Sequence, residues 1–313
     1  MRTELHRHLD ASFRPVTLFE LARAHGVPTP FTSPAEIPTH FWLTRQMASL
    51  QEVLDCFVLF QKVLRTPADL ERIAREAVED AHAEGIAQLE LRYSPSFTSE
   101  LSNIPWDAAL DAFLRGLNTA ERPDGVRVGL ICILSRGYPE EVMERTMDFA
   151  LSRRGDFIGV DLAGAEVGFP CRQFKSLFRK AIDAGLPITV HAGEACGAEN
   201  VWEAIDDLGA RRIGHGIRAI DDPMLIKRLA RDGILLETCP TSNFVTRSIA
   251  TWADHPLPRL LDAGVPVSVS TDDPGIFGVT LDDEYARCRA HLGLGDQEIA
   301  VIDAHAAKHT FLR

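Results

Sequence analysis

The sequence predicts an α/β protein folded as a (β/α)8 barrel of the TIM type, in which eight parallel strands alternate with helices. The first supporting observation is that short apolar runs alternate with longer amphipathic stretches from one end of the chain to the other. The second is that helical stretches such as PMLIKRLARDG, residues 223–233, end in a glycine just before the next apolar run. The third is the length of 313 residues, which suits a barrel of about 250 residues with insertions.

Eight runs have the length and composition of buried parallel strands. In chain order they are residues 3–10 (TELHRHLD), 86–94 (IAQLELRYS), 127–135 (RVGLICILS), 157–164 (FIGVDLAG), 187–194 (PITVHAGE), 212–217 (RIGHGI), 234–240 (ILLETCP) and 266–273 (PVSVSTDD). Between them, stretches such as residues 66–85 (TPADLERIAREAVEDAHAEG) repeat apolar residues at helical spacing. We therefore expect residues 1–313 to form a single barrel domain.

One segment, residues 28–61, departs from this alternation. It lies between the first and second predicted strands and is rich in proline and aromatic residues. An insertion at this point of a barrel can cover the barrel mouth. We therefore expect an inserted helical lid after the first strand.

Composition limits the function classes. The net charge is −12 and no stretch concentrates lysine and arginine, which argues against binding to a nucleic-acid backbone. The N-terminal residues are polar and no apolar run approaches the roughly 18 residues of a membrane helix, so we expect a cytoplasmic protein with no membrane partner. The six cysteines lack CxxC spacing, which argues against a zinc-finger cluster or a disulfide framework.

Histidines lie near the C-terminal ends of three predicted strands, where barrel enzymes place their chemistry. His6 and His8 are two residues apart in the first run, so they share one face of that strand. His191 belongs to the fifth run and His215 to the sixth. Each of these, taken alone, could be a surface residue or a histidine satisfied within the core.

Two adjacent aspartates, Asp272 and Asp273, close the last predicted strand. Strand alternation puts Asp272 on the same face as Ser268 and Ser270, while Asp273 precedes a Pro-Gly turn. Taken alone, the pair could form an Asx turn that caps the following helix. A barrel, however, brings its strand ends together around one axis, and histidine and aspartate are ligands that a catalytic zinc accepts.

The residues at the ends of the first, fifth and eighth strands therefore form a candidate metal site. They are His6, His8, His191 and Asp272. A metal-activated water also needs a proton acceptor and an orienting neighbour, and the substrate needs an acid. The residues left near the same end of the barrel to supply these catalytic roles are Glu194, His215 and Asp273.

Seven ordered motifs then point to a known family. They are ELHRHLD, ELRYSP, VDLAGAE, VHAGE, RIGHGI, LETCPTSN and STDDPGIFG. With them the chain resembles the adenosine deaminase family of the amidohydrolase superfamily over almost its whole length. The resemblance implies one zinc ion per chain, held by the four candidate ligands. The fourth predicted strand, FIGVDLAG, also lacks the lysine that bridges two metals in other relatives.

The resemblance implies substrate roles for individual residues. Glu194 would protonate N1 of a 6-aminopurine, while His215 and Asp273 would hold the attacking water against C6. Asp273 would also face N7, the backbone of Gly164 would meet N3, and Asp10 would meet the sugar. The implied reaction is the hydrolytic deamination of a small-molecule purine nucleoside to its 6-oxo product and ammonia.

Several substrate hypotheses remain open. Relatives that act on free adenine typically carry HLEGT, whereas this chain has Asp10 after His8 and Leu9, which favours a nucleoside. A purine-binding protein with a dead site is another alternative, against which the intact ligand set argues. Arg14 could bind a 5′ substituent such as the benzoate of 6-aminodeoxyfutalosine, or it could form a salt bridge with the next helix instead.

Overall fold

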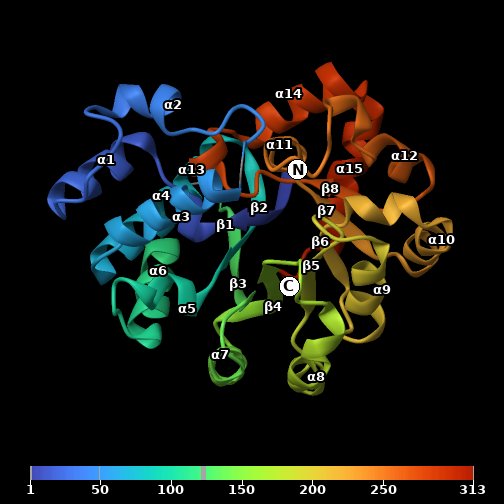
Figure 1. Ribbon diagram of the computed structural model, residues 1–313, viewed down its shortest axis with the longest axis horizontal. Helices are drawn as coiled ribbons and strands as arrows, with labels where there is room; N and C mark the ends of the chain where they lie inside the picture. Colours follow the sequence, from blue (N-terminus) through green and yellow to red (C-terminus); the bar gives the residue numbers. More distant parts are fainter. Residues whose placement is uncertain (1, 49, 121–124, 313) are drawn as a thin grey trace.

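The computed structural model describes residues 2–48, 50–120 and 125–312. Within these ranges, eight strands occupy the centre and helices surround them (Figure 1). The strands are β1 (Arg2–His8), β2 (Ile86–Tyr93), β3 (Arg127–Arg136), β4 (Phe157–Gly164), β5 (Ile188–Ala192), β6 (Arg212–His215), β7 (Leu235–Thr238) and β8 (Val267–Val269). Each predicted strand has its counterpart, so the predicted barrel is confirmed.

The α-helices of the same ranges follow the strands in the expected alternation. They are α1 (Pro15–Ala24), α2 (Ile37–His40), α3 (Leu50–Val63), α4 (Pro67–Ala83), α5 (Pro95–Glu100), α6 (Trp106–Thr119), α7 (Glu140–Ser152), α8 (Lys175–Ala184), α9 (Ala198–Asp206), α10 (Pro223–Asp232), α11 (Pro240–Val245), α12 (Leu257–Asp262), α13 (Pro274–Phe277), α14 (Leu281–Leu292) and α15 (Asp296–His309). Local signals set their ends. In α4, for example, Thr66 and Asp69 form a capping box around Pro67.

The barrel closes between its first and last strands. Each strand pairs in parallel with the next one in chain order, from β1 to β8. Just beyond β8, Asp272 forms a parallel bridge with Arg7 of β1. The amide of His8 donates to the carbonyl of Asp272 at 2.8 Å, and the amide of Asp272 donates to the carbonyl of His6 at 3.0 Å. Residues from both ends of the chain therefore become neighbours.

The last strand is shorter than the sequence predicts. β8 ends at Val269, whereas the predicted run continues to Asp273. The backbone of Asp272 is left-handed, with φ of +61°, a conformation that is uncommon outside glycine. This residue turns the chain out of the strand direction, so that Asp272 and Asp273 lie at the C-terminal end of the barrel.

The predicted lid segment is attached to the loops that follow β7 and β8. The amide of Leu43 donates to the carbonyl of Ile276 at 2.9 Å, and the amide of Met47 donates to the carbonyl of Val245 at 2.9 Å. The described part of the segment contains α2 and most of α3, on the same side of the barrel as α1 (Figure 1). Its role as a cover of the site stays a prediction.

A layer of buried ion pairs fills the barrel interior. The guanidinium of Arg92 lies 2.8 Å from both Asp161 and Glu237. The guanidinium of Arg212 lies 2.6 Å from Glu90 and 2.7 Å from Glu237. Charges are tolerated in such a dry environment only when they are paired. We call these five residues the ionic layer. Two of them, Asp161 and Glu237, also contact histidines near the C-terminal end of the strands.

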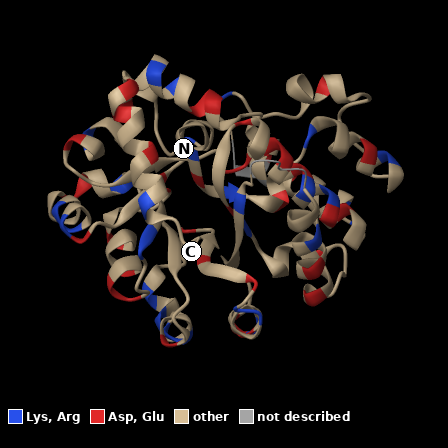
Figure 2. Cartoon of the chain, turned by 180° about the vertical axis from the view of Figure 1, so that it is seen from behind, with Lys and Arg blue, Asp and Glu red and all other residues tan. Residues whose placement is uncertain are grey.

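The exterior carries charges of both signs (Figure 2). Lysine and arginine are interspersed with aspartate and glutamate over the outer helices (Figure 2). In the portion of the chain that the structure describes, none of the helices has both the length and the apolar content needed to span a bilayer. The six cysteines are free thiols, and all but Cys196 are buried.

Candidate metal centre and active site

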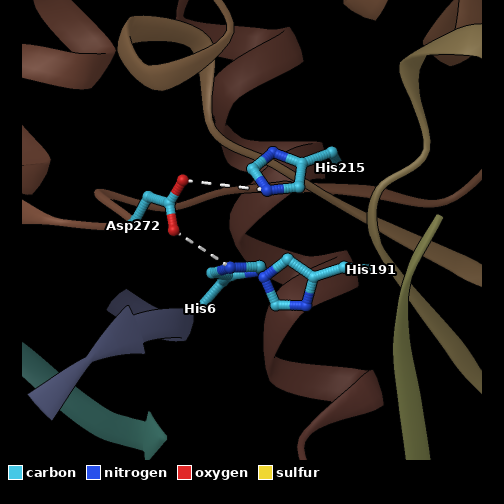
Figure 3. Close-up of side chains that lie close together, drawn as sticks. All are labelled: His6, His191, His215 and Asp272. Atoms are coloured by element: carbon cyan, nitrogen blue, oxygen red, sulfur yellow. Dashed lines mark ion pairs between the residues drawn. The ribbon is translucent and has the colours of Figure 1, made fainter. Parts of the chain in front are cut away.

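Four side chains from four parts of the chain meet at the C-terminal end of the barrel (Figure 3). One ligand atom from each of His6, His191, His215 and Asp272 lies within 4.8 Å of the others. Oδ1 of Asp272 is 3.2 Å from Nε2 of His6, and its Oδ2 is 3.7 Å from Nε2 of His215. All four residues are buried, so the cluster has the nitrogen and oxygen donors of a metal site.

His8, which the sequence analysis included among the ligands, lies near the same carboxylate oxygen as His6. Its Nε2 is 3.3 Å from Oδ1 of Asp272, and it forms a second potential metal-binding group with Asp272 and Asp273. Burial would lower the pKa of His8, but the carboxylates of Asp273 and Asp272 raise it to about 9. The surroundings of His8 therefore favour a positive charge, whether a proton or a metal ion.

Buried carboxylates orient two of the histidines. Nδ1 of His6 lies 2.9 Å from Glu237, and Nδ1 of His191 lies 3.1 Å from Asp161. A carboxylate at Nδ1 keeps the proton on that nitrogen and leaves the Nε2 lone pair for a metal. Burial also lowers the pKa of His191 to about 3, so its ring is neutral as a ligand must be.

The surroundings of Nε2 of His6 indicate whether the cluster fits a cation. Within the described part of the chain this buried nitrogen makes no hydrogen bond, although Oδ1 of Asp272 is 3.2 Å away. A buried polar atom without a partner calls for an explanation. Two ligands of one cation lie at such a separation, so the residues present fit a metal ion.

The sequence analysis did not single out Glu237 or Asp161, although the motifs that contain them were noted. The available signal was a carboxylate within an apolar strand, in LLET and in VDLAG. Such a residue is almost never fully buried unless it is paired. Both carboxylates belong to the ionic layer and also contact the metal cluster, so they connect the barrel interior to the site.

Glu194, the predicted acid, lies on the loop after β5. Its Oε2 is 3.5 Å from Nε2 of His215. Burial raises the pKa of Glu194 above the ordinary value, and the carboxylate of Asp272 acts in the same direction against the opposing effect of His215. The raised pKa favours the protonated form, which is the form that a general acid needs.

A second glutamate, Glu166, holds the loop that carries Glu194. Its buried carboxylate accepts hydrogen bonds of 2.6–3.1 Å from five groups. The donors are the backbone amides of Gly193, Glu194, Ala195 and Cys196 and the side-chain amide of Asn200. The sequence analysis noted the motif VDLAGAE but gave Glu166 no role. Because one carboxylate fixes four successive residues, it sets the position of the Glu194 backbone.

The predicted substrate contacts have polar atoms available. Among the described residues, Oδ1 of Asp10 and Oδ1 of Asp273 are buried without a hydrogen-bond partner. Gly164, at the end of β4, has φ of +89° and remains exposed, a conformation that a side chain would strain. Gly164 is thus exposed at the end of β4, and its contact with a ligand stays a prediction.

With this geometry established, comparison with known proteins decides the family. The family model for adenosine deaminase matches residues 2–313. The chain belongs to the adenosine deaminase family. It is therefore a metal-dependent aminohydrolase that uses a divalent metal, and the histidine and aspartate cluster is the candidate site for that metal.

Individual relatives within and around the adenosine deaminase family agree. An adenosine deaminase from Erwinia tasmaniensis is 40% identical over 99% of this chain and 93% of its own length. The crystal structure of an adenine deaminase from Arthrobacter aurescens has a TM-score of 0.91 at 31% identity, covering 100% of this chain and 94% of the other. An amidohydrolase from Burkholderia ambifaria, with bound zinc, has a TM-score of 0.89 at 25% identity, covering 100% and 86%.

Arg14 forms salt bridges, as in the second alternative of the sequence analysis, but its partners lie on α4 and not on the next helix, α1. Its guanidinium lies 2.6 Å from Asp80 and 3.1 Å from Glu79, both on α4. These ion pairs account for its charge without a substrate carboxylate. The expectation that Arg14 binds a 5′ substituent is therefore replaced by a salt bridge to the helix, and the argument for 6-aminodeoxyfutalosine loses its basis. Sequence spacing could not reveal these partners, because Glu79 and Asp80 lie 65 and 66 residues further along the chain.

Proposed function

We propose that this chain hydrolyses adenosine to the 6-oxo nucleoside and ammonia. The observation that carries the proposal is the position of His215. Its Nε2 has the Glu194 carboxylate at 3.5 Å and the Asp272 carboxylate at 3.7 Å. The proposed general acid and a proposed metal ligand thus lie on either side of one imidazole. The reaction needs this arrangement, because a ring nitrogen must be protonated next to the carbon that water attacks.

The proposed metal is one zinc ion, held by His6, His8, His191 and Asp272. Two of these ligands are imidazoles oriented by buried carboxylates, and the aspartate brings the negative charge that divalent cations require. A zinc ion there would supply Lewis acidity that brings the pKa of a coordinated water toward neutrality.

The catalytic residues then move and hold protons at defined atoms. Glu194 donates its proton to N1 of the purine, which weakens the aromatic resistance of C6 to attack. His215 and Asp273 hydrogen-bond the attacking water and orient it toward C6. One proton of the attacking water passes to the amino group, which leaves as ammonia as the C6–N6 bond breaks. The other proton of the water returns to Glu194, and the oxygen becomes the 6-oxo group.

Binding of the rest of the nucleoside falls to Asp10, Gly164 and Asp273. The unpartnered Oδ1 of Asp10 can accept from a ribose hydroxyl, and the unpartnered Oδ1 of Asp273 can face the N7 edge. The open backbone of Gly164 is positioned for N3. Since Arg14 is neutralised by Glu79 and Asp80, unmodified adenosine is the proposed substrate.

A second candidate substrate is free adenine. It is favoured by the structural similarity to the adenine deaminase from Arthrobacter aurescens, at a TM-score of 0.91. Against it stands Asp10, whose buried carboxylate would lose its sugar partner if the substrate were adenine.

The deciding experiment measures metal content by elemental analysis and then ammonia release from adenosine and from adenine by the same preparation. We expect about one zinc per chain and a higher kcat/KM for adenosine. A higher kcat/KM for adenine would replace the proposed substrate. A zinc-loaded protein that released ammonia from neither compound would instead support a purine-binding protein without catalysis.

A further inference from the structure

His215 differs from the other histidines of the cluster in what faces its inner nitrogen. Nδ1 of His6 and of His191 meets a carboxylate, whereas Nδ1 of His215 lies 3.1 Å from the side-chain amide nitrogen of Asn243. The backbone of His215 is left-handed, with φ of +59°, and the residue is 2% exposed. Its ring is therefore held from both sides, and the proton arrangement at Nδ1 depends on Asn243.

A continuous hydrogen-bond chain runs outward from this contact. The side-chain oxygen of Asn243 lies 3.3 Å from Nε2 of His255. Nδ1 of His255 in turn lies 3.1 Å from the backbone nitrogen of Leu257. His215, Asn243 and His255 are all buried. The three polar contacts that link them to one another and to Leu257 therefore have no bulk water to exchange with, and donors must be matched to acceptors along the whole hydrogen-bond chain.

The backbone N–H of Leu257, at the outer end of this hydrogen-bond chain, determines every proton position in it. A backbone N–H can only donate, so Nδ1 of His255 accepts from Leu257. Burial, aided by the nearby His215, lowers the pKa of His255 to about 3, so this ring is neutral and its single proton lies on Nε2. That N–H donates to Asn243, which must present its oxygen there and its NH2 group to His215.

We propose that Asn243 and His255 are positioning residues that hold His215 as the Nε2–H tautomer, with that N–H directed at the reaction site. The Asn243 amide donates to Nδ1 of His215, which leaves Nε2 as the protonated nitrogen. The role in catalysis rests on the proposed function, but the tautomer itself follows from the hydrogen-bond chain alone. His215 is then a hydrogen-bond donor to the attacking oxygen rather than the base that removes its proton.

The same reasoning separates two possible ligand sets. His6, His191 and Asp272 are common to both, and the fourth ligand is either His215 or His8. A metal ligand must offer an unprotonated nitrogen. The hydrogen-bond chain that starts at Leu257 places a proton on Nε2 of His215. That nitrogen is therefore excluded as a ligand, and His8 completes the ligand set.

Replacement of Asn243 by aspartate tests the tautomer directly. In Asn243→Asp the new carboxylate only accepts, so it accommodates the Nε2–H of His255 and requires a proton on Nδ1 of His215. We would record ¹⁵N spectra of histidine-labelled zinc-loaded protein and assign His215 from the signals absent in His215→Gln. The wild type should show Nε2 protonated and Nδ1 unprotonated, and Asn243→Asp should show Nδ1 protonated.

Two variants of His255 keep the test informative if Asn243→Asp folds poorly. His255→Leu removes the donor to Asn243 and should allow a mixture of His215 tautomers. His255→Gln retains an N–H in the same direction and should recover the wild-type signal. The matched control is His305→Leu, because Nδ1 of His305 also accepts from a backbone N–H, that of Val267, but outside the chain that leads to His215. This control should leave the His215 signals unchanged.

Kinetics supply the second measurement. Loss of one oriented donor at a reacting oxygen typically lowers kcat about 100-fold or more, so we expect that loss in Asn243→Asp, with KM within about threefold and zinc content unchanged. His255→Gln should retain more of kcat than His255→Leu. A purely structural role would lower thermal stability in all three variants without changing the ¹⁵N tautomer signals.

The proposal is overturned if Nδ1 of His215 is protonated in the wild type, or if Asn243→Asp leaves it unprotonated. A wild-type Nε2 signal that indicates coordination to zinc would also overturn it. Failure of the proposed function is a separate result: a protein that releases no ammonia from adenosine, but shows the expected tautomers, keeps the hydrogen-bond chain and loses only its proposed substrate.

Discussion

Nδ1 of His6 donates to the carboxylate of Glu237 across 2.9 Å, and neither side chain has any surface exposed to solvent. The same carboxylate lies 2.8 Å from Arg92 and 2.7 Å from Arg212. Although burial would raise the pKa of Glu237, the two guanidinium groups hold it well below the ordinary value. Glu237 thus remains an anion, which keeps the proton of His6 on Nδ1.

We expect Glu237→Gln to lower metal affinity about 10- to 100-fold, because the neutral amide no longer fixes His6 with its Nε2 lone pair toward the metal. Competition with a chelator measures this. The matched control is Glu284→Gln. Glu284 is also fully buried, but burial raises its pKa to about 8, so at pH 7 glutamine resembles its neutral form. Equal metal affinity in both variants would remove Glu237 from the metal site.

The two adjacent aspartates should separate in their effects on metal content. Asp272→Asn should lower metal content, because a neutral amide is a poorer ligand than a carboxylate. Asp273→Asn should keep the metal and lose turnover, since Asp273 is assigned to the water and the purine. Elemental analysis after dialysis provides the measurement. Unchanged metal content in Asp272→Asn would contradict its assignment as a ligand.

Glu194→Gln should retain the metal and lower kcat by about 10²- to 10⁴-fold, because the amide fills the space but cannot protonate N1. In the wild type the acid is active while protonated, and burial raises its pKa. Activity should therefore persist to a higher pH than an ordinary glutamate allows and fall as the pH rises through the raised pKa. A residual rate in the variant should lack this alkaline decline.

The exposed neighbour Glu199, in the first turn of α9, provides the control for the Glu194 experiment. Glu199→Gln should retain both kcat and the wild-type pH profile. A Glu194→Gln variant with the same rate as Glu199→Gln would show that another residue protonates the substrate.

Glu166→Gln tests whether the loop beneath the acid is fixed by one carboxylate. Glutamine keeps a single accepting oxygen and introduces an NH2 group opposite backbone donors, so the loop at Glu194 should shift. A displacement of about 1 Å at a catalytic group can lower the rate about 100-fold. We expect a loss of kcat of that order with metal content unchanged. Wild-type kcat would mean that the loop holds its position without Glu166.

Asp10→Ala distinguishes a nucleoside from a free base. If Asp10 accepts from the ribose, its removal should lower kcat/KM for adenosine about tenfold or more, which corresponds to roughly 1.4 kcal/mol. The rate with adenine should change much less, because adenine has no sugar. Steady-state ammonia release from both compounds gives the ratio. An equal loss of kcat/KM for both compounds would mean that Asp10 stabilises the first strand and does not bind the sugar.

The barrel could be predicted because its signals are local. Strand β3, for example, contains a continuous apolar run, and glycines such as Gly185 and Gly233 end the preceding helices in the left-handed conformation. The end of β8 could not be placed, since the left-handed backbone of Asp272 depends on its pairing with Arg7 of the first strand.

The residue types of the site were also accessible, but their pairings were not. Strand ends indicated where His6, His191 and Asp272 would converge. The orientation of the rings depends on residues from other strands, such as Glu237, and the role of Arg14 depends on α4. These are long-range contacts that no spacing along the chain encodes, so the sequence supplied the ligands without the groups that orient them.

The bridge between Arg7 and Asp272 has a consequence for how the active site is assembled. His6 and His8 lie at the start of the chain, and the aspartate that completes the metal cluster is also the residue whose backbone closes the sheet. Neither half of the chain alone can form the site, so the site requires contact between two segments that lie far apart in the sequence. A bound metal would connect β1 to the segment that follows β8. Because the metal binds only the closed barrel, its binding free energy opposes opening of the barrel.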